Sequence, residues 1–139
     1  MPGEAPEAFQ YALLRVVPDV ERGEFVNAGV VVFARRHGYL AARVAVDRER
    51  LEALAPGVDS EPVDERLRAL AAVAAGEPRA GALAELPASE RFAWLVAPSS
   101  TVIQPSEVHT GVCDDPEAML EHLYERLVAQ PRNPADEFT

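Results

Sequence analysis

Apolar and polar residues follow a strand-like pattern through the first third of the chain. Alternation over residues 9–17 predicts a strand whose apolar face is interrupted by Arg15. Residues 25–34 predict a second strand, and because its second half is apolar at successive positions, it is typical of a central strand covered on both faces. The polar stretch 35–38 predicts a turn, so residues 39–46 are expected to return as a third strand, antiparallel to the second.

Helical periodicity replaces this pattern in the middle of the chain. Asp47 is expected to cap a short helix over residues 48–55. Asp59 or Ser60 is expected to cap a longer helix that ends near Ala75, before a glycine. Its apolar stripe is predicted to contain Val63, Leu67, Leu70, Ala71 and Ala74.

The last third mixes apolar and hydroxyl-bearing residues before a final helix. Ser89 is expected to cap a short helix, and residues 101–108 are expected to be extended, with a break or bulge at Pro105. Asp115 predicts the start of the final helix, which Pro131 is expected to end. The buried face of that helix is predicted to contain Met119, Leu120, Leu123 and Leu127.

These elements together predict an α+β fold. An antiparallel sheet, rich in hairpins and built mostly from the N-terminal half, is expected to pack against three to four helices. We expect residues 1–139 to form a single domain. Within it we distinguish N-terminal strands over 9–46, a helical middle over 47–87, and a motif-bearing segment with the last helix over 88–130. Residues 1–8 are polar and proline-rich, and we expect them to be frayed.

The composition narrows the classes of function. The net charge is −10 and all 13 basic residues are Arg, so a general phosphate-binding surface, and with it nucleic-acid binding, is not expected. A single cysteine excludes an internal disulfide, and together with only three His it argues against a zinc site. No signal peptide and no apolar run of roughly 20 residues is visible, so we expect a cytoplasmic protein that needs no membrane and no cofactor.

Two long motifs resemble a known family. The first combines residues 11–18 with residues 22–33, and the second combines 100–104 with 108–116. Together they resemble the small bacterial family catalogued as domain of unknown function 3037, and the resemblance covers nearly the whole chain. It implies no reaction and no catalytic residues. It implies a partner instead, namely a kinase-like protein that resembles the HipA toxins.

The two motifs supply a candidate polar site. It contains Arg15, Arg22, Glu24, Asn27, Ser100, Thr101, Gln104, Ser106, His109, Thr110, Cys113 and Asp114. Arg15 lies among apolar neighbours, and a buried guanidinium must be paired. One interpretation is an internal salt bridge from Arg15 to Glu24 or Asp114, and the other is an anion clamp formed with Arg22.

Asn27 and Gly29 lie on the same side of the predicted second strand. Glycine there often marks a bulge or the close approach of other backbone or a ligand. Asn27 can satisfy backbone groups at such an edge or bulge. Glu24, in the preceding turn, is a weak candidate for a general base.

Each polar residue of the second motif has a structural and a chemical interpretation. Cys113 could be a thiolate activated by His109, or simply a small buried residue. The hydroxyls of residues 99–101 could bond turn backbone, or could form a phosphate cradle or a phosphorylation target. Asp115 and its neighbour Asp114 are explained by helix capping, and they would hold Mg²⁺ only with further oxygen ligands.

Two functions remain open from the sequence. The first is an accessory protein that binds a HipA-like kinase. The alternative is an enzyme or binding protein for a small ligand or phosphate, whose pocket combines Arg15, Arg22 and Glu24 with residues 99–113. The alternative predicts that these two sets of residues face each other across a concavity.

Overall fold

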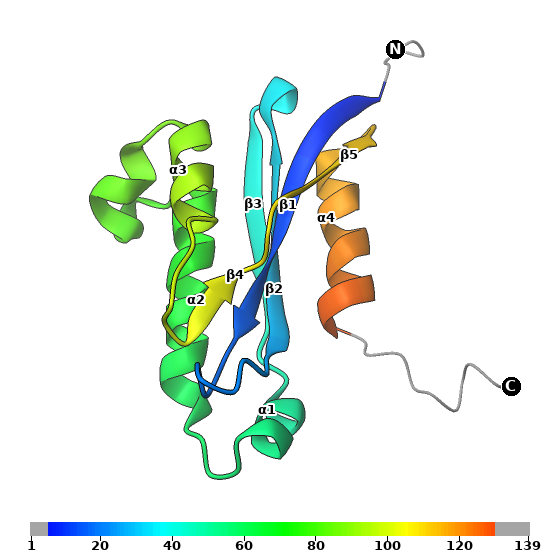
Figure 1. Cartoon of the computed structure of the whole chain (residues 1–139). Helices are drawn as coiled ribbons and strands as arrows, with labels where there is room; N and C mark the ends of the chain where they lie inside the picture. The colour runs from blue at the N-terminus through cyan, green and yellow to red at the C-terminus, as the bar shows by residue number, and fades with distance from the viewer. Residues whose placement is uncertain (1–5, 130–139) are drawn as a thin grey trace, which may run out of the picture.

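The computed structural model describes residues 6–129. Its centre is an antiparallel sheet in which β2 pairs with β3 on one side and with β1 on the other, while β4 and β5 both pair with the remaining edge of β1 (Figure 1). The strands are β1 Glu7–Val16, β2 Val26–Ala34, β3 Tyr39–Val44, β4 Ile103–Pro105 and β5 His109–Cys113. The fold is therefore α+β, as predicted.

Helices cover both faces of the sheet, α2 and α3 on one face and α4 on the other, with α1 at the lower end in Figure 1. The helices are α1 Arg48–Leu54, α2 Ser60–Ala75, α3 Ala88–Leu95 and α4 Pro116–Tyr124, with 3₁₀ segments at Arg35–His37 and Pro78–Glu85 and a π segment at Glu125–Ala129. No helix within residues 6–129 combines the length and apolarity that crossing a bilayer requires.

The sheet separates two hydrophobic cores. Val31 and Phe33 of β2 point to the core that contains Leu67 of α2 and Phe92 of α3. Val32, the residue between them, points to the core that contains Leu123 of α4. Because both faces are covered, the apolar run in β2 confirms the prediction of a central strand.

A bulge interrupts the pairing of β1 with β2. Leu14 is opposite Gly29, whereas Arg15 is opposite Asn27, so Ala28 is the extra residue of β2. A Cβ on Gly29 would lie 2.9 Å from Val44 Cγ1 and 3.2 Å from the carbonyl oxygen of Arg43. The bulge lies at Ala28, next to Gly29, and the close backbone approach expected at Gly29 is confirmed.

Side-chain caps begin most helices where the sequence predicts them. Asp47, Asp59 and Asp115 each accept a hydrogen bond at 3.1 Å from a backbone N–H in the first turn of α1, α2 and α4. Ser89 does not do so, because α3 begins one residue earlier and Pro87 is its N-cap. The prediction for Ser89 was therefore wrong.

The strand boundaries differ at the N-terminus. Glu7 and Ala8 are not frayed, because they belong to β1 and lie opposite Cys113 and Val112 of β5. Their partners are more than 100 positions away, so no local pattern indicates the pairing. Pro131, expected to end the last helix, lies outside the described residues.

Candidate functional site

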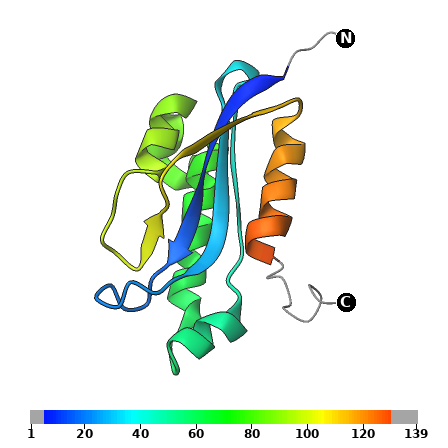
Figure 2. The same ribbon diagram turned by 45° about the vertical axis from the view of Figure 1, so that its right-hand side comes forward.

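The segment between α3 and α4 brings the two motifs together on neighbouring strands. It runs along the free edge of β1, pairing Arg15 with Gln104 in β4 and Tyr11 with His109 in β5 (Figure 2). Residues from the N-terminal and C-terminal thirds therefore share one edge of the sheet.

Ser106 lies where this segment changes from β4 to β5. Its backbone N–H donates to the carbonyl oxygen of Leu13 at 2.8 Å, and its Oγ accepts from the N–H of Leu13 at 2.8 Å. The hydroxyl in turn donates to the carbonyl oxygen of Glu107. Ser106 is 4% exposed, so this hydroxyl replaces a ladder hydrogen bond at the break, which is a structural role.

Three polar candidates form a row across β2, β1 and β4. Asn27 and Gln104 lie opposite Arg15 on its two sides. Asn27 Nδ2 donates to the carbonyl oxygen of Leu127 at 3.3 Å, and the guanidinium of Arg15 lies 4.2 Å from the centre of the Phe25 ring. Arg15 Nε and Asn27 Oδ1 are buried and make no hydrogen bond. The row thus contains one unpaired donor and one unpaired acceptor among its buried atoms.

Arg22 and Glu24 form their own pair in the β1–β2 turn. Arg22 Nε donates to Glu24 Oε1 at 2.8 Å, and this hydrogen bond lowers the pKa of the Glu24 carboxyl. Both side chains are exposed. Within residues 6–129 Arg15 makes no ion pair, so the internal salt bridges considered for it are absent there.

The hydroxyls after α3 are used in a local turn. Ser99 Oγ lies 2.8 Å from Thr101 Oγ1 and accepts from the N–H of Thr101 at 3.2 Å. Thr101 Oγ1 donates to the carbonyl oxygen of Ile103, and Gln104 Nε2 donates to the carbonyl oxygen of Thr101. Ser100, between them, is exposed. These bonds correspond to the structural interpretation of this stretch.

His109 and Cys113 lie at opposite ends of β5. The ring of His109 packs against the ring of Tyr11, with the ring centres 5.1 Å apart and the planes tilted by 32°. Thr110 beside it is exposed. Cys113 is buried in the core under α4, and burial, with smaller contributions from Asp114 and Asp115, raises the pKa of its thiol. The two side chains are four residues apart in an extended strand, about 13 Å. The geometry therefore favours a buried structural Cys113 over an activated thiolate.

The row at Arg15 and the residues at His109 are also separated. Arg15 lies opposite Gln104, whereas His109 lies opposite Tyr11, and half-buried Leu13 stands between those two positions of β1. Four residues of strand span about 13 Å. The structure brings Arg15, Asn27 and Gln104 together, and it places Arg22 with Glu24 in the turn.

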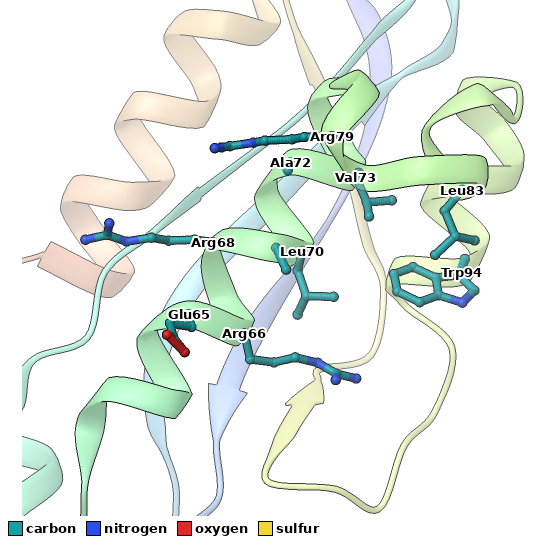
Figure 3. A pocket seen from close by; sticks show the side chains of 11 residues that line it. Glu65, Arg66, Arg68, Leu70, Ala72, Val73, Arg79, Leu83 and Trp94 are labelled. Atoms are coloured by element: carbon teal, nitrogen blue, oxygen red, sulfur yellow. The ribbon is translucent and has the colours of Figure 1, made fainter.

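A hollow lies elsewhere, between α2, the 3₁₀ segment Pro78–Glu85 and α3 (Figure 3). It has a volume of about 630 Å³, and we call it the Trp94 groove. Leu70, Val73, Leu83 and Trp94 point into the same space, and Trp94 is 41% exposed. A hollow of this size lies within the range of about 300–1,000 Å³ that ligand sites occupy.

Residues with helical spacing on α2 form one wall of the groove. Arg66, Leu70 and Val73 are spaced i, i+4 and i+7, so they lie along one flank of the helix, next to α3. A second hollow of about 220 Å³ shares Arg66, Leu70 and Trp94 and extends to Ser99 and Thr101. The groove thus ends at the hydroxyl turn.

Three arginines line the groove, and carboxylates neutralise two of them. Arg68 is paired with Asp64 at 3.0 Å and Arg79 with Glu77 at 3.2 Å, and both point away from Trp94 (Figure 3). Arg66 extends beneath Trp94, and it makes no ion pair with any residue from 6 to 129. The lining of the larger hollow includes one carboxylate, Glu65, and no Ser, Cys or His. Such a surface can bind apolar and anionic groups but has no nucleophile.

The sequence reasoning did not select the Trp94 groove. Phe92 and Leu95 of α3 are buried, whereas Trp94 lies off that apolar stripe. The position of Trp94, an aromatic residue outside the buried face of a short helix, was the signal in the sequence that could have indicated this groove. Across the described part of the chain, no group of three or more His, Cys, Asp or Glu side chains could hold a metal ion.

Comparison with known proteins gives one match. A family model described as protein of unknown function (DUF3037) matches residues 11–128, which confirms the resemblance carried by the two motifs. No curated protein and no solved structure matches the chain.

Proposed function

Since the chain belongs to the DUF3037 family of proteins of unknown function, we propose a role from its own surface. It is an accessory protein that binds another protein through the Trp94 groove. The observation that carries this proposal is Trp94 itself. It is the only tryptophan of the chain and it stands 41% exposed in an apolar groove of about 630 Å³.

A tryptophan exposed beside other apolar side chains is a suitable anchor for a partner protein. A Trp side chain can bury roughly 150–250 Å², and tryptophan is enriched among the residues that dominate binding energy at interfaces. Leu70 and Leu83 beside it are half-buried, so the apolar surface is continuous. Covering this groove with an apolar side chain of a partner would remove that surface from water.

The charge of the groove indicates the chemistry of the partner. Arg66 lies beneath Trp94, and its guanidinium can form two parallel hydrogen bonds to a carboxylate. The chain as a whole has a net charge of −10, so an arginine that makes no ion pair within residues 6–129 is a local departure from its surface. We therefore expect the partner to present an apolar side chain next to a carboxylate.

The family resemblance supports one class of partner. We propose a kinase-like protein that resembles the HipA toxins, and we propose that this chain restrains or presents it. The acidic surface and the absence of a nucleophile from the groove lining support a binding role over a catalytic one.

A second candidate function rests on the polar row. Arg15 Nε and Asn27 Oδ1 are buried without hydrogen-bond partners, and such groups are costly unless a ligand or water satisfies them. We propose as the alternative that the guanidinium of Arg15 binds a small anion such as phosphate, whereas Asn27 Oδ1, an acceptor, does not contact the anion. Titration with inorganic phosphate, followed by the amide signals of Arg15 and Asn27, tests it. A phosphate concentration of about 10 mM is far above a useful Kd. If the signals do not change at that concentration, this candidate function is wrong.

The main proposal is tested by co-expression with the proposed HipA-like kinase and size-exclusion chromatography. Co-elution at micromolar concentration is expected, and Trp94→Ala should weaken binding roughly 30-fold, the effect of a hot-spot tryptophan. Val20→Ala is the matched control, because Val20 is an exposed apolar residue in the β1–β2 turn. Separate elution of the two wild-type proteins would overturn the proposal.

The single tryptophan allows a second readout. If only this chain is labelled with 5-fluorotryptophan, the complex has one ¹⁹F signal, and it comes from the groove. We expect that signal to shift on addition of the partner. Co-elution without a shift would place the interface elsewhere and would contradict the groove as the binding surface.

A further inference from the structure

Strand β5 leaves one of its edges without a partner. It pairs with β1 on one side, and within the described residues no strand pairs with its other side. Alternate residues of a strand direct their N–H and C=O groups to opposite sides. The outer edge of β5 therefore presents a row of backbone donors and acceptors that fits an extended segment.

The side chains along this edge are apolar and uncharged. Val108, Thr110 and Val112 are exposed, Val112 by 65%. Of the six large apolar side chains that are exposed in residues 6–129, two lie at this edge, namely Val108 and Val112. Edge strands are usually protected by Lys, Pro or inward charges, and residues 108–113 contain none of these.

Negative charge flanks the uncharged stretch at both ends. Glu107 precedes it, and Asp114 and Asp115 follow it. Arg35 and Arg36 lie across β1 from β5, and Arg36 pairs with Glu7 at 3.8 Å. The outer edge itself therefore has carboxylates at its two ends and no cation beside them in sequence.

These charges disfavour a second copy of the chain as the occupant in the two central registers. A symmetric antiparallel pairing centred on Thr110 and Gly111, or on Gly111 alone, would place Glu107 opposite Asp114 or Asp115 of the other copy. Like charges directly opposite in a sheet are destabilising. An asymmetric partner with the opposite charge does not meet this repulsion.

We propose that the outer edge of β5 binds a β-strand of another protein, one with β-branched residues at alternate positions and basic residues at both ends. The backbone ladder supplies the affinity, the valines pack against the β-branched side chains, and the flanking carboxylates select the basic ends. This surface is distinct from the Trp94 groove, and it does not depend on the function proposed for that groove.

Three synthetic peptides test the proposal on the full chain. KRVTVTVRK should bind, measured by fluorescence anisotropy, and it should slow hydrogen exchange at the amides of β5. EDVTVTVDE, with reversed ends, should bind at least about tenfold more weakly. KRGSGSGRK keeps the charge without β-branched residues and should also bind at least about tenfold more weakly.

Variants separate this site from unspecific attraction. Glu107→Lys combined with Asp114→Lys should reverse the preference in favour of EDVTVTVDE, while Asp115 is retained because it caps α4. Glu21→Lys with Glu49→Lys makes the same change of charge at exposed positions in the β1–β2 turn and α1, and it should keep the wild-type preference. Trp94→Ala should leave peptide binding unchanged.

Three results would overturn the inference. The first is equal binding of KRVTVTVRK and KRGSGSGRK, which would indicate charge attraction alone. The second is binding without protection of the β5 amides. The third is dimerisation of the chain through β5 in sedimentation equilibrium, because it would show that a second copy occupies this edge.

Discussion

The ring of Phe9 lies directly against Gly111 of the neighbouring strand. The two residues are opposite each other in the pairing of β1 with β5, and a Cβ on Gly111 would lie 2.8 Å from Phe9 Cε1. Phe9 is 4% exposed and belongs to the core under α4. Gly111 therefore allows an aromatic ring to cover the edge strand, and the glycine of the second motif has a packing explanation.

Gly111→Ala should destabilise the protein by about 1–3 kcal/mol, because overpacking forces the ring or the strand to shift. Urea unfolding measures the change. Val112→Ala is the matched control, since that side chain is 65% exposed and its loss should cost little. If Gly111→Ala has the same urea midpoint of unfolding as the wild type, the packing of Phe9 against Gly111 is not rigid.

Ser106→Ala should cost about 1–3 kcal/mol, because it leaves the N–H of Leu13 without its acceptor at a buried position. Ser99→Ala, at an exposed turn, should change the free energy of unfolding by less than about 0.5 kcal/mol. Hydrogen exchange at the amide of Leu13 gives an independent check, since it should accelerate in the first variant and stay constant in the second.

Asp115→Ala should lower stability by about 0.5–2 kcal/mol, because the carboxylate caps the first turn of α4. Asp114→Ala removes an equal charge from the adjacent exposed position and should have a smaller effect. Thermal unfolding of the two variants compares them. Equal losses would indicate that negative charge near the helix N-terminus, and not the cap hydrogen bond, is what matters.

Stability should fall as the pH rises above 9. Burial raises the pKa of the Cys113 thiol from its ordinary value of 9.0 and that of the Tyr39 hydroxyl from 10.0. The unfolded chain then loses these protons at lower pH than the folded chain. The stabilisation is complete below the ordinary values and is lost as the pH passes through the raised ones.

Unfolding in urea between pH 8 and pH 11 measures this decline. Tyr39→Phe combined with Cys113→Ala should flatten the curve, because neither replacement titrates. A decline of unchanged size in the double variant would assign it to other groups.

The sequence predicted the elements whose signals are local. The hairpin of β2 and β3 follows from the apolar run to Ala34 and the turn that Gly38 closes at a positive φ of 61°. The caps at Asp47 and Asp115 follow from short acidic side chains before apolar periodicity. Such signals depend only on residues a few positions apart in the chain, so they can be read from a single sequence.

The remaining features depend on long-range register. Nothing near Glu7 indicates that Cys113 will lie opposite it, and nothing near Arg15 indicates Gln104. The candidate residues were therefore identified as a set, but their separation along β1 was not. Trp94 was missed for a related reason, because its exposure depends on how α3 packs against α2.

The pairing of β1 has a consequence for synthesis on the ribosome. One side of β1 is completed early by β2, a few residues later in the chain, whereas the other side waits for residues 103–113. During translation that side stays open while roughly 90 further residues are made, at about 5–20 residues per second. The nascent hairpin must therefore stay protected from stray strand pairing for several seconds before its own C-terminal third closes it.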